Sequence, residues 1–221
     1  MSQEDPIQQP FFKKTYAIVL ALLGWASLIL QFYLLLKNKT SDISLWSRFF
    51  NFFSYFTILT NILVALSLTL TVLGLKNRIG RFFRNDSVQS ALTVYILIVG
   101  VVYYLLLRNI WKPQGLQFLA DVTLHYAVPV LYLVYWLIFI PKGKLRLRYA
   151  ISWMAYPALY FIYSLIRGAV THWYPYPFID AQTSGYNTVF LNAAVLLVAF
   201  IAAVLIFIGV DRLLAGKAVK R

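Results

Sequence analysis

Long apolar runs separated by short polar stretches make up almost the whole chain. Six of these runs are long enough to cross a bilayer, which takes roughly 20 helical residues at about 1.5 Å each. We place them near residues 15–36, 49–73, 88–107, 118–140, 149–167 and 188–210. The pattern therefore predicts an all-α fold, a polytopic membrane protein built as a six-transmembrane-helix bundle.

The predicted helices divide the chain into a simple domain plan. Residues 1–12 are polar and contain proline, which predicts a disordered N-terminal tail; residues 13–212 form a single six-helix transmembrane domain, and residues 213–221 form a basic C-terminal tail. The longest predicted loop, residues 168–187, is rich in aromatic residues, and Pro175 and Pro177 disfavour a helix there. We expect it to fold over the mouth of the bundle as a lid, with a plain interfacial anchor as the alternative.

The amino-acid composition excludes a water-soluble protein. Hydrophobic residues make up 61% of the 221 residues and charged residues only 12%, against about 45–50% and about 25% in soluble chains. The mean hydropathy is +0.73. A water-soluble fold cannot bury that much apolar surface, so the sequence indicates an integral membrane protein. The absence of cysteine excludes a disulfide framework, a thiol nucleophile and a thiolate metal site.

The net charge of +13 comes from basic clusters between the apolar runs. This placement is typical of topology signals and of contacts with anionic lipid headgroups, so we expect membrane lipids as partners and no nucleic acid. Fourteen Lys and Arg residues fall on one side of the predicted bundle and six on the other, which predicts that both termini are cytoplasmic. The fourteen are Lys13, Lys14, Lys76, Arg78, Arg81, Arg84, Lys142, Lys144, Arg146, Arg148, Arg212, Lys217, Lys220 and Arg221, and the six are Lys37, Lys39, Arg48, Arg108, Lys112 and Arg167.

Polar residues inside the predicted spans are few, and each must be satisfied within the bundle or face a wet cavity. On the second and fourth spans, Thr57 lies about 12 Å below the outer end and His125 about 10 Å below it, counted at about 1.5 Å per residue. Asp121 precedes His125 by four residues and shares its helix face. A hydroxyl nucleophile needs a base, and the base gains from a group that orients it. We therefore expect Thr57 as nucleophile, His125 as base and Asp121 as the orienting carboxylate.

Further polar residues extend this candidate site. Ser54, Thr57 and Asn61 share one face of a continuous second helix, so Asn61 or Ser54 is expected to donate to the oxyanion. Arg167, near the outer end of the fifth span, is suited to bind a fatty carboxylate, and Asn192 on the sixth span is a further substrate-binding candidate. The structural alternatives are a Thr57 hydroxyl bonded to the preceding turn, Asn residues that bridge helices, Asp121 as a helix cap, and an Arg167 that reaches the interface.

Other classes of site lack the necessary residues. With two histidines, one of them His172 in a loop, and no cysteine, we expect no metal, and the absence of nucleotide-binding fingerprints argues against a cofactor. Pro129, four residues after His125, leaves the carbonyl of His125 without its helical donor and is expected to kink the helix.

Three features together resemble the Pr-six-Pr family of prokaryotic six-helix membrane proteins: Phe56-Thr57 followed by Asn61, His125 followed by Pro129, and the segment Trp173-Tyr174-Pro175-Tyr176-Pro177-Phe178-Ile179-Asp180. That family is distantly similar to the androgen-induced-gene/ADTRP family of intramembrane threonine hydrolases. The resemblance covers roughly three quarters of the chain. It implies hydrolysis of fatty acid esters of hydroxy fatty acids, with the threonine matching Thr57 and the histidine matching His125.

Two departures from the family pattern leave alternatives open. The relatives have a polar residue three positions after the threonine, where this chain has Thr60, so Thr60 is the alternative nucleophile. The spacing from the histidine to the proline is also one residue shorter here. We predict a lipid-ester hydrolase in a prokaryotic cytoplasmic membrane; the alternative is a non-enzymatic lipid-binding or lipid-transfer protein that uses the same polar residues.

Overall fold

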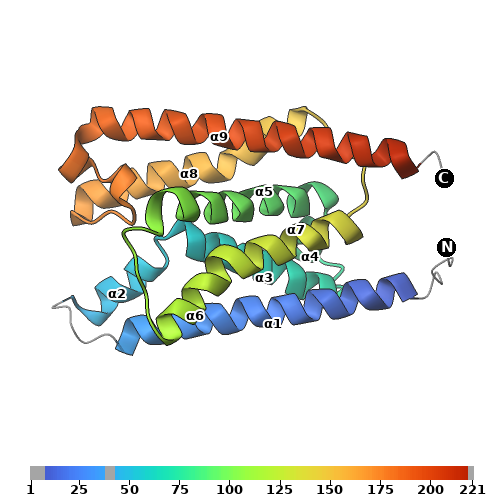
Figure 1. Ribbon diagram of the computed structural model, residues 1–221, viewed down its shortest axis with the longest axis horizontal. Helices are drawn as coiled ribbons and strands as arrows, with labels where there is room; N and C mark the ends of the chain where they lie inside the picture. The colour runs from blue at the N-terminus through green and yellow to red at the C-terminus, as the bar shows by residue number, and fades with distance from the viewer. Residues whose placement is uncertain (1–7, 38–42, 219–221) are drawn as a thin grey trace. The chain divides into compact units, whose positions relative to one another are not determined.

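The computed structural model of the protein describes residues 8–37 and 43–218, and in these ranges the chain is helical apart from short connections (Figure 1). Six helical segments are long and apolar enough to cross a membrane, which confirms the predicted all-helical, multi-pass membrane protein. They are Phe11–Lys37, Phe56–Leu73, Asp86–Leu107, Leu116–Phe139, Arg148–Thr171 and Ala181–Ala215.

The chain forms two compact units, Met1–Arg48 with Thr57–Pro141, and Phe49–Phe56 with Lys142–Arg221. The first unit contains α1 (Gln8–Lys37), α3 (Phe56–Leu73), α4 (Arg78–Phe83), α5 (Asp86–Val102), the π-helical segment η1 (Tyr103–Leu107), α6 (Leu116–Val122), the π-helical segment η2 (Thr123–Ala127) and α7 (Val128–Phe139). The second contains the C-terminal half of α2 (Leu45–Phe52), α8 (Arg148–Thr171), the 3-10 turn η3 (Pro177–Ile179) and α9 (Ala181–Ala218).

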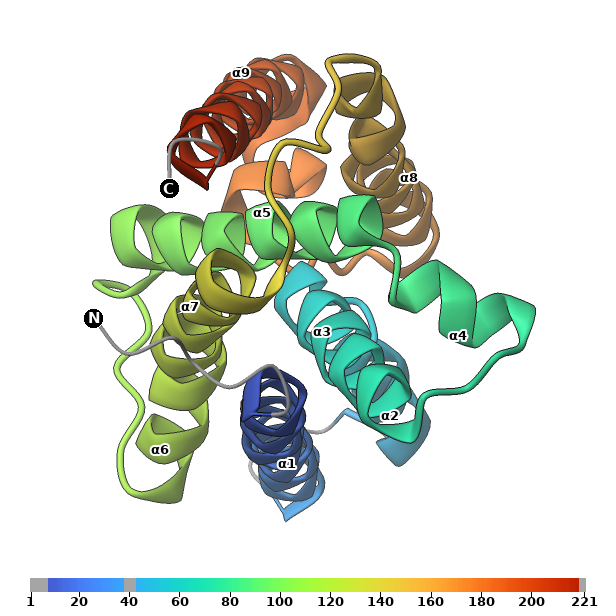
Figure 2. The same ribbon diagram turned by 90° about the vertical axis from the view of Figure 1, so that its right-hand side faces the viewer.

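In the first unit, α5 packs against α7, and α1 packs against α6 and α7 (Figure 2). Trp136 on α7 is buried, and its Nε1 donates to Ser90 Oγ on α5 at 2.7 Å. Trp25 on α1 donates to Thr69 Oγ1 on α3 at 3.0 Å. Hydrogen bonds of this kind stabilise helix pairs where lipid supplies no hydrophobic driving force between them.

The predicted second span is not one helix: α2 ends at Phe52 and α3 begins at Phe56. Between them the N–H groups of Ser54 and Tyr55 bond to carbonyls three residues back, at 3.0 and 3.5 Å, and Ser54 Oγ donates to the carbonyl of Phe50 at 2.7 Å. The expected helix face shared by Ser54, Thr57 and Asn61 was therefore wrong for Ser54. The depth of Thr57 was counted along a continuous helix from residue 49, so that count does not apply to α3.

Helix ends also differ from the prediction. The predicted disordered tail lies outside the described residues up to residue 7, and α1 already begins at Gln8. The predicted 20-residue outer loop is shorter, because α8 continues to Thr171 and α9 begins at Ala181. Gly185, with φ 74°, interrupts the first turns of α9 just before the predicted start of that span. Within the basic tail, residues 213–218 belong to α9 and residues 219–221 lie outside the described part.

The aromatic segment Trp173–Asp180 is packed within the second unit. Trp173 and Tyr176 lie edge-on to the ring of Tyr55, with ring centroids 5.7 and 5.6 Å apart. Tyr174 occupies the space beside Gly168, where a Cβ atom would come within 2.0 Å of the tyrosine ring. Burial raises the pKa of Tyr55, although the nearby Arg167 partly opposes the rise. These contacts hold the segment in one place; that it covers the mouth of the bundle stays a prediction.

Asp180 caps the start of α9, and its removal should destabilise the second unit. Its Oδ1 accepts from the backbone N–H groups of Gln182 and Thr183 at 2.9 and 3.2 Å, and its Oδ2 accepts from Thr183 Oγ1 at 2.7 Å. Slight burial pushes the pKa of Asp180 up, but the hydrogen bonds from Thr183 and Gln182 outweigh it, so the pKa lies below its usual value.

We expect Asp180→Ala to cost roughly 1 kcal/mol at pH 7, seen as a thermal midpoint about 2–4 °C lower. Because the folded pKa is depressed, this contribution is present above the unfolded value near 4 and is lost as the pH falls through the folded pKa. Asp180→Asn is the matched control, since asparagine caps a helix without titrating. Equal midpoints for the wild type and Asp180→Ala at pH 7 would contradict the capping role.

Candidate functional site

Two π-helical segments face each other in the first unit. In η1 the N–H of Arg108 bonds to the carbonyl of Tyr103 at 2.9 Å, and in η2 the N–H of Val128 bonds to the carbonyl of Thr123. Pro129, in the first turn of α7, has no N–H for the carbonyl of His125 in η2; that it kinks the helix stays a prediction. Single π turns of this kind are frequent at functional sites.

Asp121 and His125 form the predicted pair. His125 Nδ1 lies 3.2 Å from Asp121 Oδ1 and 2.9 Å from the backbone carbonyl oxygen of the same residue. Both neighbours are acceptors, so we assign the hydrogen of the neutral ring to Nδ1, which leaves the lone pair on Nε2. The side chain of Asp121 is 4% exposed and that of His125 14% exposed. The imidazole is therefore oriented by a buried carboxylate and retains some access from outside.

Tyr103 is a third member of this cluster. Its hydroxyl donates to Asp121 Oδ2, so each carboxylate oxygen has its own partner. Its ring stacks on the imidazole of His125, with centroids 3.9 Å apart and planes inclined by 19°. Tyr103 thus fixes both the carboxylate and the plane of the histidine ring.

Tyr103 was not among the predicted site residues, although its position in the sequence carried a signal. Tyr103 lies four residues before the outer end of the third predicted span, or about 6 Å down, and Asp121 lies three residues into the fourth, or about 4.5 Å down. Counting depth along these two spans therefore places the side chains of Tyr103 and Asp121 at similar levels. A tyrosine near a helix end is normally an interfacial anchor, so sequence position alone does not distinguish Tyr103 from such an anchor.

Asn61 connects the Thr57 turn of α3 to the histidine segment. Its Nδ2 donates to the carbonyl of Thr57 at 2.8 Å and to the carbonyl of Leu124, next to His125, at 3.3 Å. Both amide hydrogens are used in this way, so the predicted donation from Asn61 to an oxyanion finds no support. Its Oδ1 is buried and has no hydrogen-bond partner among the described residues. Asn61 acts as the helix bridge that was the structural alternative.

The two threonines on α3 differ in exposure. Thr57, in the first turn of the helix, is 8% exposed, and Thr60 is 0% exposed. A nucleophile must be reached by its substrate, so this difference favours Thr57 over Thr60.

The remaining predicted site residues lie in the second unit, where each has local partners. Ser54 Oγ lies 2.9 Å from Tyr163 Oη in addition to its bond to Phe50, and Asn192 Nδ2 donates to the carbonyl of Phe178 at 2.8 Å. These contacts tie α2 to α8 and the aromatic segment to α9. They give Ser54 and Asn192 structural roles in this unit.

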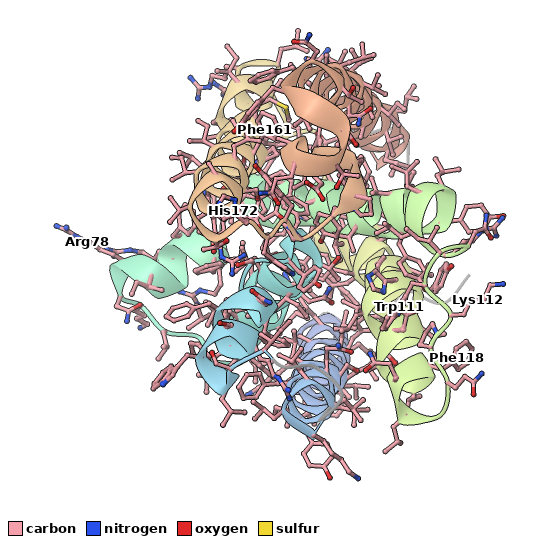
Figure 3. The ribbon with its side chains drawn as sticks, turned by 90° about the vertical axis from the view of Figure 1, so that its left-hand side faces the viewer. Arg78, Trp111, Lys112, Phe118, Phe161 and His172 are labelled. Atoms are coloured by element: carbon pink, nitrogen blue, oxygen red, sulfur yellow. The ribbon has the colours of Figure 1, made fainter. Side chains whose placement is uncertain are left out.

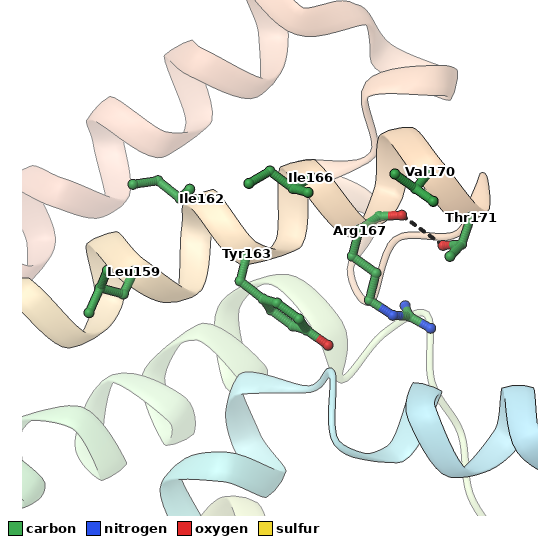
Figure 4. Close-up of a pocket in the computed structure, with 7 residues that line it drawn as sticks. All are labelled: Leu159, Ile162, Tyr163, Ile166, Arg167, Val170 and Thr171. Atoms are coloured by element: carbon green, nitrogen blue, oxygen red, sulfur yellow. Dashed lines mark hydrogen bonds between the residues drawn. The ribbon is translucent and has the colours of Figure 1, made fainter.

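Arg167 also makes internal contacts. Its Nη2 donates to Asn51 Oδ1 at 2.6 Å, and its guanidinium carbon lies 4.6 Å from the centre of the Trp173 ring. A groove of about 480 Å³ beside it on α8 is lined mainly by apolar side chains such as Ile162 and Ile166; Figure 4 shows these side chains along the helix. Arg167 on α8 therefore contacts both the end of α2 and the aromatic segment. That it binds a fatty carboxylate stays a prediction.

Among the residues that the structure describes, no three His, Asp or Glu side chains gather closely enough to hold a metal ion. Comparison with known proteins found no matching family model, no matching curated protein and no matching solved structure.

Proposed function

We propose that the protein is an intramembrane lipid-ester hydrolase in which Thr57 is the nucleophile and His125 the general base. The observation that carries this proposal is the pairing of His125 with the buried Asp121, with Nδ1 directed at two acceptors and Nε2 left as a base. An ionisable pair inside a membrane span is costly, which favours a functional role over a packing role. The bridge from Asn61 to the carbonyls of Thr57 and Leu124 supports the nearness of the nucleophile to the base.

Hydrolysis of the ester proceeds in two steps, acylation of Thr57 and hydrolysis of the acyl-threonine. Thr57 Oγ1 attacks the ester carbonyl carbon while its proton passes to His125 Nε2, and collapse of the tetrahedral intermediate breaks the bond to the leaving alkoxide, which takes that proton. Water then attacks the acyl-threonine with the same base, releasing the carboxylic acid and restoring Thr57. Asp121 stabilises the imidazolium that forms in each step, and Tyr103 fixes Asp121 and the ring plane. No step requires a cofactor.

The substrate class rests on the resemblance to the threonine hydrolases. Fatty acid esters of hydroxy fatty acids are amphiphiles that partition into a bilayer, where spans containing Thr57 and His125 meet them directly. We place the protein in a prokaryotic cytoplasmic membrane with both termini cytoplasmic, as the distribution of Lys and Arg favours.

This proposal can be tested by assaying the purified full-length protein in detergent for hydrolysis and for covalent labelling. We expect it to release fatty acid from such an ester and to form a stable adduct with a lipophilic phosphonate, mapped by mass spectrometry to the peptide that contains Thr57. Binding of the ester without release of acid, and without an adduct, would instead support the lipid-binding or lipid-transfer alternative, because a binder has no activated hydroxyl to trap.

The proposed topology has a direct test, because the chain contains no cysteine. Lys112→Cys and Arg81→Cys each introduce a single thiol at an exposed position on opposite sides of the predicted membrane. In intact cells we expect a membrane-impermeant maleimide to label Lys112→Cys and to spare Arg81→Cys until the cells are opened. The reverse pattern would place both termini outside.

A further inference from the structure

The short helix α4 connects two membrane spans and is strongly basic. It lies between α3, which ends at Leu73, and α5, which begins at Asp86, so its position is limited to the membrane surface where those spans end. Figure 2 shows α4 projecting from the connection between α3 and α5. Residues 74–85 carry four basic and no acidic side chains.

The side chains of α4 form two adjacent rows. Ile79 and Phe82, three residues apart, are 60% and 58% exposed. Arg78 and Arg81, also three residues apart, are exposed beside them, and Lys76 precedes them; Figure 3 shows Arg78 extended away from the helix. No ion pair involves these basic residues in the described ranges. A helix with an apolar row beside a basic row is typical of segments that lie in the headgroup layer.

The loop is held in place by contacts that leave these rows free. Asn77 accepts from the N–H of Gly80 at 2.8 Å, and Arg84 donates to the carbonyls of Gly80 and Leu75 at 3.1 and 2.7 Å. A Cβ atom on Gly80 would lie 2.3 Å from the carbonyl oxygen of Leu75, so the turn is tight. Ser67 on α3 donates to the carbonyl of Phe83 at 3.0 Å. Of the basic residues in the loop, Arg84 thus maintains the fold, and Lys76, Arg78 and Arg81 point outward.

We propose that α4 and Lys76 form a binding surface for anionic glycerophospholipids. In this surface Ile79 and Phe82 enter the acyl boundary of the leaflet, and Lys76, Arg78 and Arg81 contact the phosphate groups above it. Charge complementarity selects lipids with a net negative headgroup, and the apolar row selects lipids over soluble anions. This inference does not depend on hydrolysis at Thr57.

Lipid binding to purified full-length protein in neutral detergent tests the surface, with native mass spectrometry to count bound lipids. We expect phosphatidylglycerol to bind more tightly than phosphatidylcholine, and Arg78→Gln/Arg81→Gln to weaken phosphatidylglycerol binding by roughly 10- to 30-fold, about fivefold for each charge. Phosphatidylcholine binding should change little. Raising the salt concentration should weaken the wild type and have less effect on the variant.

Lys37→Gln/Lys112→Gln is the matched control, since it removes two exposed charges from the end of the first unit opposite to α4. An equal loss of phosphatidylglycerol in this control, or no loss in Arg78→Gln/Arg81→Gln, would overturn the proposal. Should the α4 variant not fold, a headgroup-photoreactive phosphatidylglycerol on the wild type decides the matter, because adducts must then map to residues 76–84. Displacement of the lipid by free glycerol phosphate at equal concentration would contradict the role of Ile79 and Phe82.

Discussion

Thr57→Val is expected to reduce hydrolysis of a lipid ester by roughly four to six orders of magnitude and to abolish phosphonate labelling. Valine keeps the shape of threonine but has no hydroxyl, so the fold should persist while the nucleophile is lost. Thr60→Val is the matched control on the same helix: Thr60 is fully buried, and we expect this variant to keep both activities. The measurements are the initial rate of fatty acid release and the yield of adduct.

The reverse outcome would identify Thr60 as the nucleophile. If Thr60→Val is inactive and Thr57→Val is labelled normally, the nucleophile lies three residues further along α3. Asn61, which bonds to the carbonyls of Thr57 and Leu124, would then serve only to join the helices.

Asp121→Asn is expected to lower turnover by roughly two to four orders of magnitude with little change in KM. The amide keeps the size of the carboxylate and one acceptor oxygen, but it removes the negative charge that stabilises the imidazolium in the transition state. Because Asp121 touches His125 and Tyr103 rather than the proposed nucleophile, the loss should fall on kcat. If the protein only binds lipid, Asp121→Asn should instead lower its affinity for lipid.

Tyr103→Phe is the matched variant on the other side of the carboxylate. It removes one hydroxyl and keeps the ring that stacks on His125. We expect a smaller fall in kcat than for Asp121→Asn, since the charge remains and only its orientation is loosened. Hydrolysis by Asp121→Asn at the wild-type rate would rule out the orienting role and leave Thr57 and His125 as the proposed pair.

Composition predicted the membrane spans because six long apolar runs have no other stable arrangement in this chain. It did not predict the break between α2 and α3. Phe49, Phe50, Phe52 and Phe53 satisfy the same hydrophobic pattern whether or not the helix continues, and the turn depends on local bonds such as that from Ser54 to Phe50. Hydrophobic pattern therefore determines which segments enter the membrane and leaves the continuity of each helix open.

The candidate site was predictable where helix spacing alone decides contacts. Asp121 and His125, four residues apart, lie together as expected. The parts that were missed or misplaced depend on contacts between helices. Tyr103 reaches Asp121 from another helix, and Arg167 is engaged with Asn51 and Trp173, which are distant in sequence. Such contacts follow from packing, and no single stretch of sequence encodes them.

The π turns at Tyr103–Leu107 and Thr123–Ala127 make the cluster sensitive to chain length. A π turn holds one residue more than the α-helical turn it replaces, so removal of one residue from either segment would restore a regular helix without changing its hydropathy. Everything before the deletion would then rotate by about 100° relative to everything after it. Two relatives with equally apolar helices and the same polar residues could therefore differ in whether tyrosine, aspartate and histidine meet at all, through a single insertion or deletion.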